Sequence, residues 1–111
     1  LAGEVQIVVE AQEPPPLPAA VEVAAYRIAT EAMTNVVRHS GGRHAVLSLS
    51  ADADALRLCL TDDGAPDGTW SPGVGLDSIA ERAAEVGGRS EAGPTPAGGR
   101  VYAELPLGVR A

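Results

Sequence analysis

The sequence contains no phenylalanine, and aromatic residues make up only 3% of its 111 residues. A core without large rings must be filled by aliphatic side chains, so we expect alanine, valine and leucine to dominate the interior. The hydrophobic fraction of 45% is sufficient for such a core. A chain of this length is expected to form one small domain, spanning residues 1–111.

Cysteine and long hydrophobic runs are also scarce. Cys59 is the only cysteine, which excludes an intramolecular disulfide and fits a reducing compartment. No apolar run approaches the ~18 residues of a membrane span, and no signal peptide is visible. We therefore expect a cytoplasmic domain that does not itself contact a membrane. Because the chain begins at Leu1 and not at methionine, we expect a fragment of a longer protein, which can itself be membrane-anchored.

Basic residues are few: 8 lysines and arginines face 15 aspartates and glutamates, which gives a net charge of −7. Such a balance argues against a nucleic-acid groove, which needs clustered positive charge, and against binding to an anionic membrane surface. It does not exclude a nucleotide, because backbone amides and a metal ion can meet phosphate charge in an acidic domain.

The pattern along the chain predicts seven elements in the order βα, ββ, α, ββ. Pro18 should stand in the first turn of the first helix, where its missing N–H costs nothing. The expected strands are 4–10, 44–51, 55–62, 88–93 and 99–106, and the expected helices are 18–39 and 76–87. Segment 63–75 is rich in glycine and proline and is predicted to be a loop. This order predicts an α/β two-layer sandwich, with a mixed, largely antiparallel sheet and its helices on one face.

The most informative pattern is a polar stripe on the first helix. At about 100° per residue, the side chains of Glu31, Asn35, Arg38 and His39 fall within roughly a quarter turn. The expected apolar face consists of Ile28, Ala32 and Val36, joined by Ala25, Ala29, Met33 and Val37. An amide oxygen such as that of Asn35 suits Mg²⁺, and the neighbouring carboxylate, guanidinium and imidazole can handle water, protons and phosphate. An ordinary solvated helix face would give the same stripe.

A second motif, Asp62-Asp63-Gly64, ends the third predicted strand. A carboxylate here can accept a hydrogen bond from an exocyclic amino group such as that of adenine. The adjacent glycine lets a flat base approach the backbone. A simple Asp-Gly turn is the alternative.

A third motif, Gly73-Val74-Gly75-Leu76, leads into the second helix. Glycines before a helix N-terminus leave backbone N–H groups free for phosphates, and the helix dipole adds to this. The pattern is neither a Walker A motif nor a dinucleotide-binding fingerprint. A loop followed by a capped helix is the alternative.

Taken together, the motifs resemble a known family. L-P-A-A-V-E-V-A-A-Y-R-I-A-T-E-A-M-T-N-V-V-R-H-S is similar to the N box of bacterial sensor histidine kinases, in the subfamily of the nitrate sensors and the membrane-fluidity thermosensor. T-D-D-G resembles their G1 box, and G-V-G-L-D-S-I-A-E-R-A-A-E-V-G-G resembles their G2 box and following helix. G-G-R-V-Y-A-E-L-P-L resembles their last strand, so the resemblance covers nearly the whole chain.

This resemblance implies a Bergerat ATP-binding fold, as in gyrase, with ATP and Mg²⁺ as cofactors. It implies that Asn35 coordinates Mg²⁺ and that Glu31 is the acidic residue that assists phosphoryl transfer. Arg38 and His39 would lie near the phosphates.

The resemblance also assigns the nucleotide's base and the lid. Asp62 would bind the adenine amino group, with Gly64 beneath the base. Gly73 and Gly75 would border the ATP lid, together with Leu76. The chain departs from the family pattern at Pro66, at Ser78-Ile79-Ala80, and at Arg100, where threonine is usual.

A complete histidine kinase also needs a phosphoacceptor histidine on a dimerisation helix. The two histidines here are His39, within the N box, and His44, just before a strand and expected to face solvent. The sequence is therefore interpreted as the catalytic ATP-binding domain alone, which should not phosphorylate itself. Its partner would be the dimerisation and phosphoacceptor domain of the same parent protein, and indirectly a response regulator.

Two alternatives stay open at this point. An anti-sigma-factor serine kinase shares the fold and the N box, although the Glu81-Arg82 helix and the Leu-Pro-Leu ending favour the histidine kinase. A nucleotide-sensing interaction module would bind ATP and transfer nothing.

Overall fold

The computed structural model describes residues 5–13, 15–40, 43–64, 76–96 and 98–108, with the backbone alone described at 39 and 40. The elements follow the predicted order, with one addition, the short π-helical segment η1. They are β1 (Gln6–Ala11), α1 (Ala19–Asn35), η1 (Val36–Ser40), β2 (His44–Ala51), β3 (Ala55–Asp62), α2 (Leu76–Glu85), β4 (Arg89–Thr95) and β5 (Gly98–Pro106).

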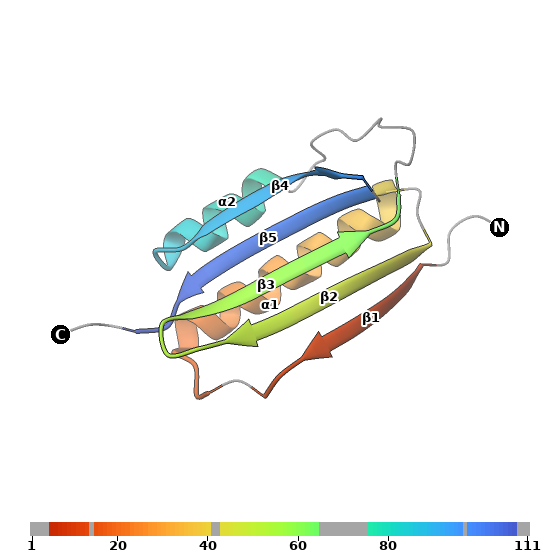
Figure 1. The fold of residues 1–111 in the computed structure, drawn as a ribbon. Helices are drawn as coiled ribbons and strands as arrows, with labels where there is room; N and C mark the ends of the chain where they lie inside the picture. Colours follow the sequence, from red (N-terminus) through yellow and green to blue (C-terminus); the bar gives the residue numbers. More distant parts are fainter. Residues whose placement is uncertain (1–4, 14, 41–42, 65–75, 97, 109–111) are drawn as a thin grey trace.

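The strands form one five-stranded sheet in the order β1-β2-β3-β5-β4. β1 pairs with β2 in parallel, and the other three pairings are antiparallel. Both helices lie on the same face of the sheet (Figure 1), where α1 contacts β3 and β5 and α2 contacts β4 and β5. The predicted two-layer α/β sandwich with a mixed, largely antiparallel sheet is therefore confirmed.

The core between the two layers is aliphatic, as the shortage of aromatic residues requires. Strands β3 and β5 alternate between buried and partly buried positions, which places every second side chain against the helices. The buried cluster consists of Val21, Ala24, Ile28, Ala32, Val36, Ala45, Leu47, Leu56, Leu58, Leu60, Ile79, Ala83, Ala103 and Leu105.

The first helix differs from its prediction at both ends. Pro18 precedes the helix as its N-cap residue, and its carbonyl accepts the Glu22 N–H at 3.0 Å. The regular helix ends at Asn35, and the chain continues as η1. Val37, predicted to lie on the apolar face, is 51% exposed, so that prediction is wrong. It lies nine residues after Ile28, which is about half a turn around the helix and hence the opposite side.

The hairpin of β2 and β3 is where the sequence predicts it, and Asp52 explains its sharp turn. The Asp52 carboxylate accepts the N–H groups of Asp54 at 2.8 Å and of Ala55 at 3.0 Å. The Arg57 guanidinium also donates to it, at 2.8 Å. These hydrogen bonds, the backbone ones first, lower the pKa of Asp52 to about 2.

The second helix and the last hairpin are shifted slightly from their predicted bounds. α2 ends at Glu85, and Gly87 follows with φ of 81°, a left-handed conformation that glycine adopts without strain. β4 extends to Thr95 and includes Pro94, because β4 is an edge strand and a proline there need not donate to a neighbour.

The connections bring the ends of several helices and strands together along one edge of the sheet, namely the edge that runs across the strand ends (Figure 1). β3 ends there, β2 and β5 begin there, and α1 arrives there through η1, which leads into β2. α2 runs away from this edge, since the strand that follows it starts at the opposite edge. Among the described helices, none is long and apolar enough to cross a membrane.

Candidate functional site

Asp62 is the last residue of the central strand β3 and lies on the helical side of the sheet. It continues the alternate series of Leu56, Leu58 and Leu60, which are all buried beneath the helices. Its carboxylate Oδ1 accepts the N–H of Gly64 at 2.8 Å, and Gly64 is itself buried. One carboxylate oxygen thus fixes the turn, and the other has no hydrogen-bond partner in the part of the chain that the structure describes.

Asp63, next in the chain, has the opposite orientation and a different role. Its carboxylate accepts the backbone N–H groups of Arg43 at 2.7 Å and of His44 at 3.0 Å, and it contacts His44 Nδ1 at 3.0 Å. These hydrogen bonds, led by the one from the His44 backbone, lower the pKa of Asp63 to about 2. Asp63 therefore ties the end of β3 to the start of β2.

The partner of Asp63 is His44, and the sequence does not predict their contact. The sequence predicts that His44 faces solvent, and 68% of its side chain is indeed exposed. It gives no signal for the contact with Asp63, because the two residues are 19 positions apart and meet only through the pairing of β2 with β3.

Asn35, the last residue of α1, carries an unexplained polar group. Its side-chain Nδ2 is buried and has no hydrogen-bond partner among the described residues. Leaving a buried amide unpaired costs about 1–3 kcal/mol, so such groups are rare unless a ligand or water completes them. Glu31, one turn earlier on the same helix, is partly buried.

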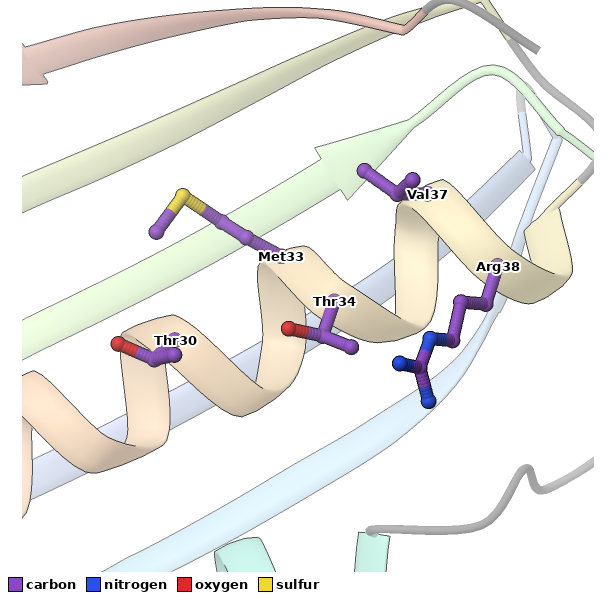
Figure 2. A pocket seen from close by; sticks show the side chains of 5 residues that line it. All are labelled: Thr30, Met33, Thr34, Val37 and Arg38. Carbon is purple, nitrogen blue, oxygen red and sulfur yellow. The ribbon is translucent and has the colours of Figure 1, made fainter.

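Arg38 is exposed on η1, on the outer side of the helical layer. Figure 2 shows that Arg38 extends to one side of the helix and Met33 and Val37 to the other, with Thr34 lying over the helix between them. Together with Thr30, these side chains line a shallow surface depression. Arg38 is therefore an exposed cation beside an open depression and not part of a closed pocket.

Four other predicted site residues divide into two groups. His39 lies in η1, but its side chain is outside the described part of the chain, as are Gly73 and Gly75 entirely. Leu76 is described: it begins α2, is partly buried and packs against the hydrophobic core. The fold thus brings the ends of α1 and β3 to one edge, and the roles of all the predicted site residues stay predictions.

Metal binding by protein side chains alone has little support in the described residues. Within those ranges, no group of three or more histidine, cysteine, aspartate or glutamate side chains is arranged to hold an ion. Magnesium, however, commonly takes only one or two protein oxygens and completes its shell with phosphates and water. One amide at the end of α1 is consistent with that mode.

The opposite face of the sheet carries Arg100, one of the residues that depart from the family pattern. Its guanidinium lies 5.0 Å from the centre of the Tyr102 ring, and that of Arg89 lies 5.6 Å from it. The Tyr102 hydroxyl donates to Glu104 at 2.9 Å. Burial and this hydrogen bond raise the pKa of Tyr102. Arg100 thus contributes to a cation–π stack away from the candidate site.

Comparison with known proteins adds the family context. No protein-family model matches the chain. It is 39% identical over 83 residues to the sensor histidine kinase YxjM of Bacillus subtilis, a match that covers 74% of this chain and 20% of that protein. It is 32% identical over 95 residues to the sensor protein VraS of Staphylococcus epidermidis, covering 82% of this chain and 27% of that protein. The chain therefore spans only about a quarter or less of these relatives.

Solved structures share the fold. The blue-light activated histidine kinase EL346 of Erythrobacter litoralis superposes with a TM-score of 0.76 at 21% identity, covering 95% of this chain and 36% of that one. The ATP-binding domain of PrrB from Mycobacterium tuberculosis superposes with a TM-score of 0.63 at 22% identity, covering 93% and 82% of the two chains. This agreement confirms the fold class that the sequence motifs predict.

Proposed function

Because the chain belongs to the sensor histidine kinases, as one of their ATP-binding domains, we propose that it binds Mg²⁺-ATP and donates the γ-phosphoryl group to a histidine. The acceptor would lie on the dimerisation domain of the same parent protein, which would pass the group to a response regulator. In this proposal residues 1–111 are the catalytic domain, and it works in the cytoplasm.

The observation that supports the proposal is the buried side-chain Nδ2 of Asn35, which has no hydrogen-bond partner among the described residues. Rotation of the amide by 180° exchanges its oxygen and nitrogen, so the same position can present an acceptor to a cation or a donor to a phosphate oxygen. Either contact would satisfy a group that is otherwise costly to bury. The residues present therefore fit a Mg²⁺-nucleotide, with Asn35 as the protein ligand.

In this proposal the end of β3 contacts the adenine base, whereas α1 and η1 contact the phosphates. Asp62 would accept the adenine amino group with its second carboxylate oxygen, while its first holds Gly64. Arg38, at the exposed rim, would meet phosphate charge. Glu31, one turn before Asn35, would orient the acceptor imidazole or take its proton. Bound Mg²⁺ would neutralise charge on the transferring group, and the side chains would supply positioning.

Phosphoryl transfer is tested with the acceptor supplied in trans. The parent's dimerisation segment is mixed with the domain, and labelled phosphate is followed from ATP to histidine. We expect wild type and Tyr26→Ala to label the added segment, and Asn35→Ala to label it at a rate lower by at least ~100-fold, since a metal ligand is lost. Tyr26 is the control, because it lies on the same helix, is 73% exposed and does not line the depression beside Arg38.

Calorimetry separates binding from transfer. Heat with ATP and Mg²⁺, without labelling of any histidine, would support a nucleotide-sensing module in place of a kinase. Labelling of serine on a partner would support the serine kinase alternative. Absence of heat at millimolar nucleotide would reject the proposal altogether. Undiminished labelling by a folded Asn35→Ala variant would reject the metal-ligand role.

A further inference from the structure

The turn that carries Asp62 rests directly on the backbone of Gly98. A β-carbon built on Gly98 would overlap the carbonyl oxygen of Asp62. It would also lie 2.8 Å from the Asp62 carbonyl carbon and 2.9 Å from the Gly64 nitrogen. Ordinary β-carbon contacts lie at 3.4–4 Å, so these atoms have no room for any side chain at position 98.

Gly98 is itself held in place by its surroundings. It is buried at the start of β5, and its N–H donates to Thr95 Oγ1 at 3.0 Å. The next residue, Gly99, is also buried and pairs with Asp62 across the sheet. The obstructing atoms are backbone atoms of a paired central strand, so they can move only if the turn moves with them.

Two other glycines provide a comparison, Gly88 just before β4 and Gly93 within it. A β-carbon on Gly93 would meet nothing within 4 Å. A β-carbon on Gly88 would overlap the Glu104 carbonyl oxygen, and it would lie 3.0 Å from a Leu105 methyl group. Gly88 is at the opposite edge of the sheet from Asp62, since β4 starts where β5 ends. Of these three, only Gly98 touches the turn that carries the candidate base-reading carboxylate.

We propose that Gly98 is a positioning residue that sets the Asp62 carboxylate for recognition of the adenine amino group. The inference rests on the proposed function of Asp62. An added methyl group would force the Asp62–Gly64 backbone and Gly98 apart by about 1 Å or more to reach an ordinary contact distance, and the carboxylate that bonds Gly64 would turn with its backbone. Hydrogen bonds weaken steeply with poor angles, so the amino group should lose its partner while the phosphate contacts on α1 remain.

The test compares ATP with purine riboside triphosphate, which has hydrogen in place of the amino group. Dissociation constants are measured by titration at fixed Mg²⁺ for wild type, Gly98→Ala, Gly93→Ala and Gly88→Ala. We expect wild type to prefer ATP about tenfold or more. Gly98→Ala should reduce this preference below about threefold, with affinity for the purine analogue unchanged. Gly93→Ala should keep the preference, and so should Gly88→Ala despite its lower melting temperature.

Three outcomes separate the two claims. If wild type binds neither nucleotide, the proposed function fails. If wild type prefers ATP and a folded Gly98→Ala keeps that preference, the positioning role is overturned. The positioning role is also overturned if Gly88→Ala loses the preference equally, because the effect then reflects stability alone.

A double variant and a milder change complete the design. In an Asp62→Asn background, Gly98→Ala should have almost no further effect on the preference, because both changes act on one hydrogen bond. Full additivity would contradict the proposal.

If Gly98→Ala does not fold, Thr95→Val removes the acceptor of the Gly98 N–H without adding bulk there. A reduced preference for ATP in that variant supports the positioning role, and an unchanged preference overturns it.

Discussion

Replacing Asp62 by asparagine should weaken ATP binding far more than the same change at Asp63. The two residues are adjacent and carry the same charge, so the pair controls for net charge and for the chemistry of the substitution. In Asp62→Asn the amide oxygen can still accept the Gly64 N–H, which now lies 2.8 Å from Oδ1. The turn should therefore survive, and only the second oxygen is exchanged for an NH₂ group.

The magnitude follows from what that exchange does to the adenine amino group. A charged hydrogen bond, worth about 1.5–3 kcal/mol, is replaced by two donors that face each other. The dissociation constant for ATP should therefore rise about 10- to 100-fold. The affinity for purine riboside triphosphate should change little, since that analogue has no amino group to offer.

Asp63→Asn acts on a different set of contacts. Oδ1 of Asp63 receives both backbone N–H groups, from Arg43 and His44, and an amide oxygen can keep both. Only the contact of Oδ2 with His44 Nδ1 is lost. We expect a lower melting temperature and a change in ATP affinity of less than about threefold, because the described contacts of Asp63 are with Arg43 and His44 at the start of β2.

Isothermal titration at constant Mg²⁺ measures both variants, and circular dichroism confirms that each is folded. Equal ATP affinities in the two folded variants would reject Asp62 as the base reader. A larger loss in Asp63→Asn would reverse the assignment. Equal losses of ATP and purine analogue in Asp62→Asn would show that the carboxylate acts on the turn and not on the amino group.

Two further predictions concern stability. Leu58 is fully buried at the centre of β3, so Leu58→Ala should lower the free energy of unfolding by about 2–5 kcal/mol in urea titrations, whereas Val37→Ala, at 51% exposure, should change it by less than about 0.5 kcal/mol. The pKa values of Asp52 and Asp63 are lowered to about 2 in the fold, from 3.8, so their stabilising contribution is complete above about pH 5 and is lost as pH falls toward 2. The difference in melting temperature between wild type and Asp63→Asn should therefore shrink over that range, and a difference that grew on acidification would contradict the assigned contacts.

Much of the fold can be predicted because its signals are local. The β2–β3 hairpin lies at its predicted bounds, since alternating leucines mark the strands and an aspartate marks the turn. The end of α2 lies within two residues of the bound predicted from Gly87, whose left-handed conformation few other residues adopt. Such features depend on the residues at the position itself, so one sequence is enough to find them.

Other features depend on contacts between distant residues and cannot be predicted in this way. The π-helical segment after Asn35 replaces a regular turn, although no proline or glycine marks the change. The contact of Asp63 with His44 and the close approach of Gly98 to Asp62 both require the strand register. The wrong prediction that Val37 lies on the apolar face has a different origin. At 100° per residue its side chain lies about half a turn from Ile28, and hence on the exposed side of the helix.

Strand alternation places Asp62 and Asp63 on opposite faces of the sheet, and this difference underlies the role that we propose for Asp62. In β3 the residues at even positions, Leu58 and Leu60 among them, face the helices, and Asp62 is the next in that series. In the proposed function, a nucleotide held by the end of α1 would lie on the helical side, where the carboxylate at the even position, Asp62, would reach it. Asp63 must face the other side, where His44 of β2 receives it. A shift of one residue in the register would exchange the two faces, so under the proposed function the buried leucines would indirectly determine which aspartate reads the base.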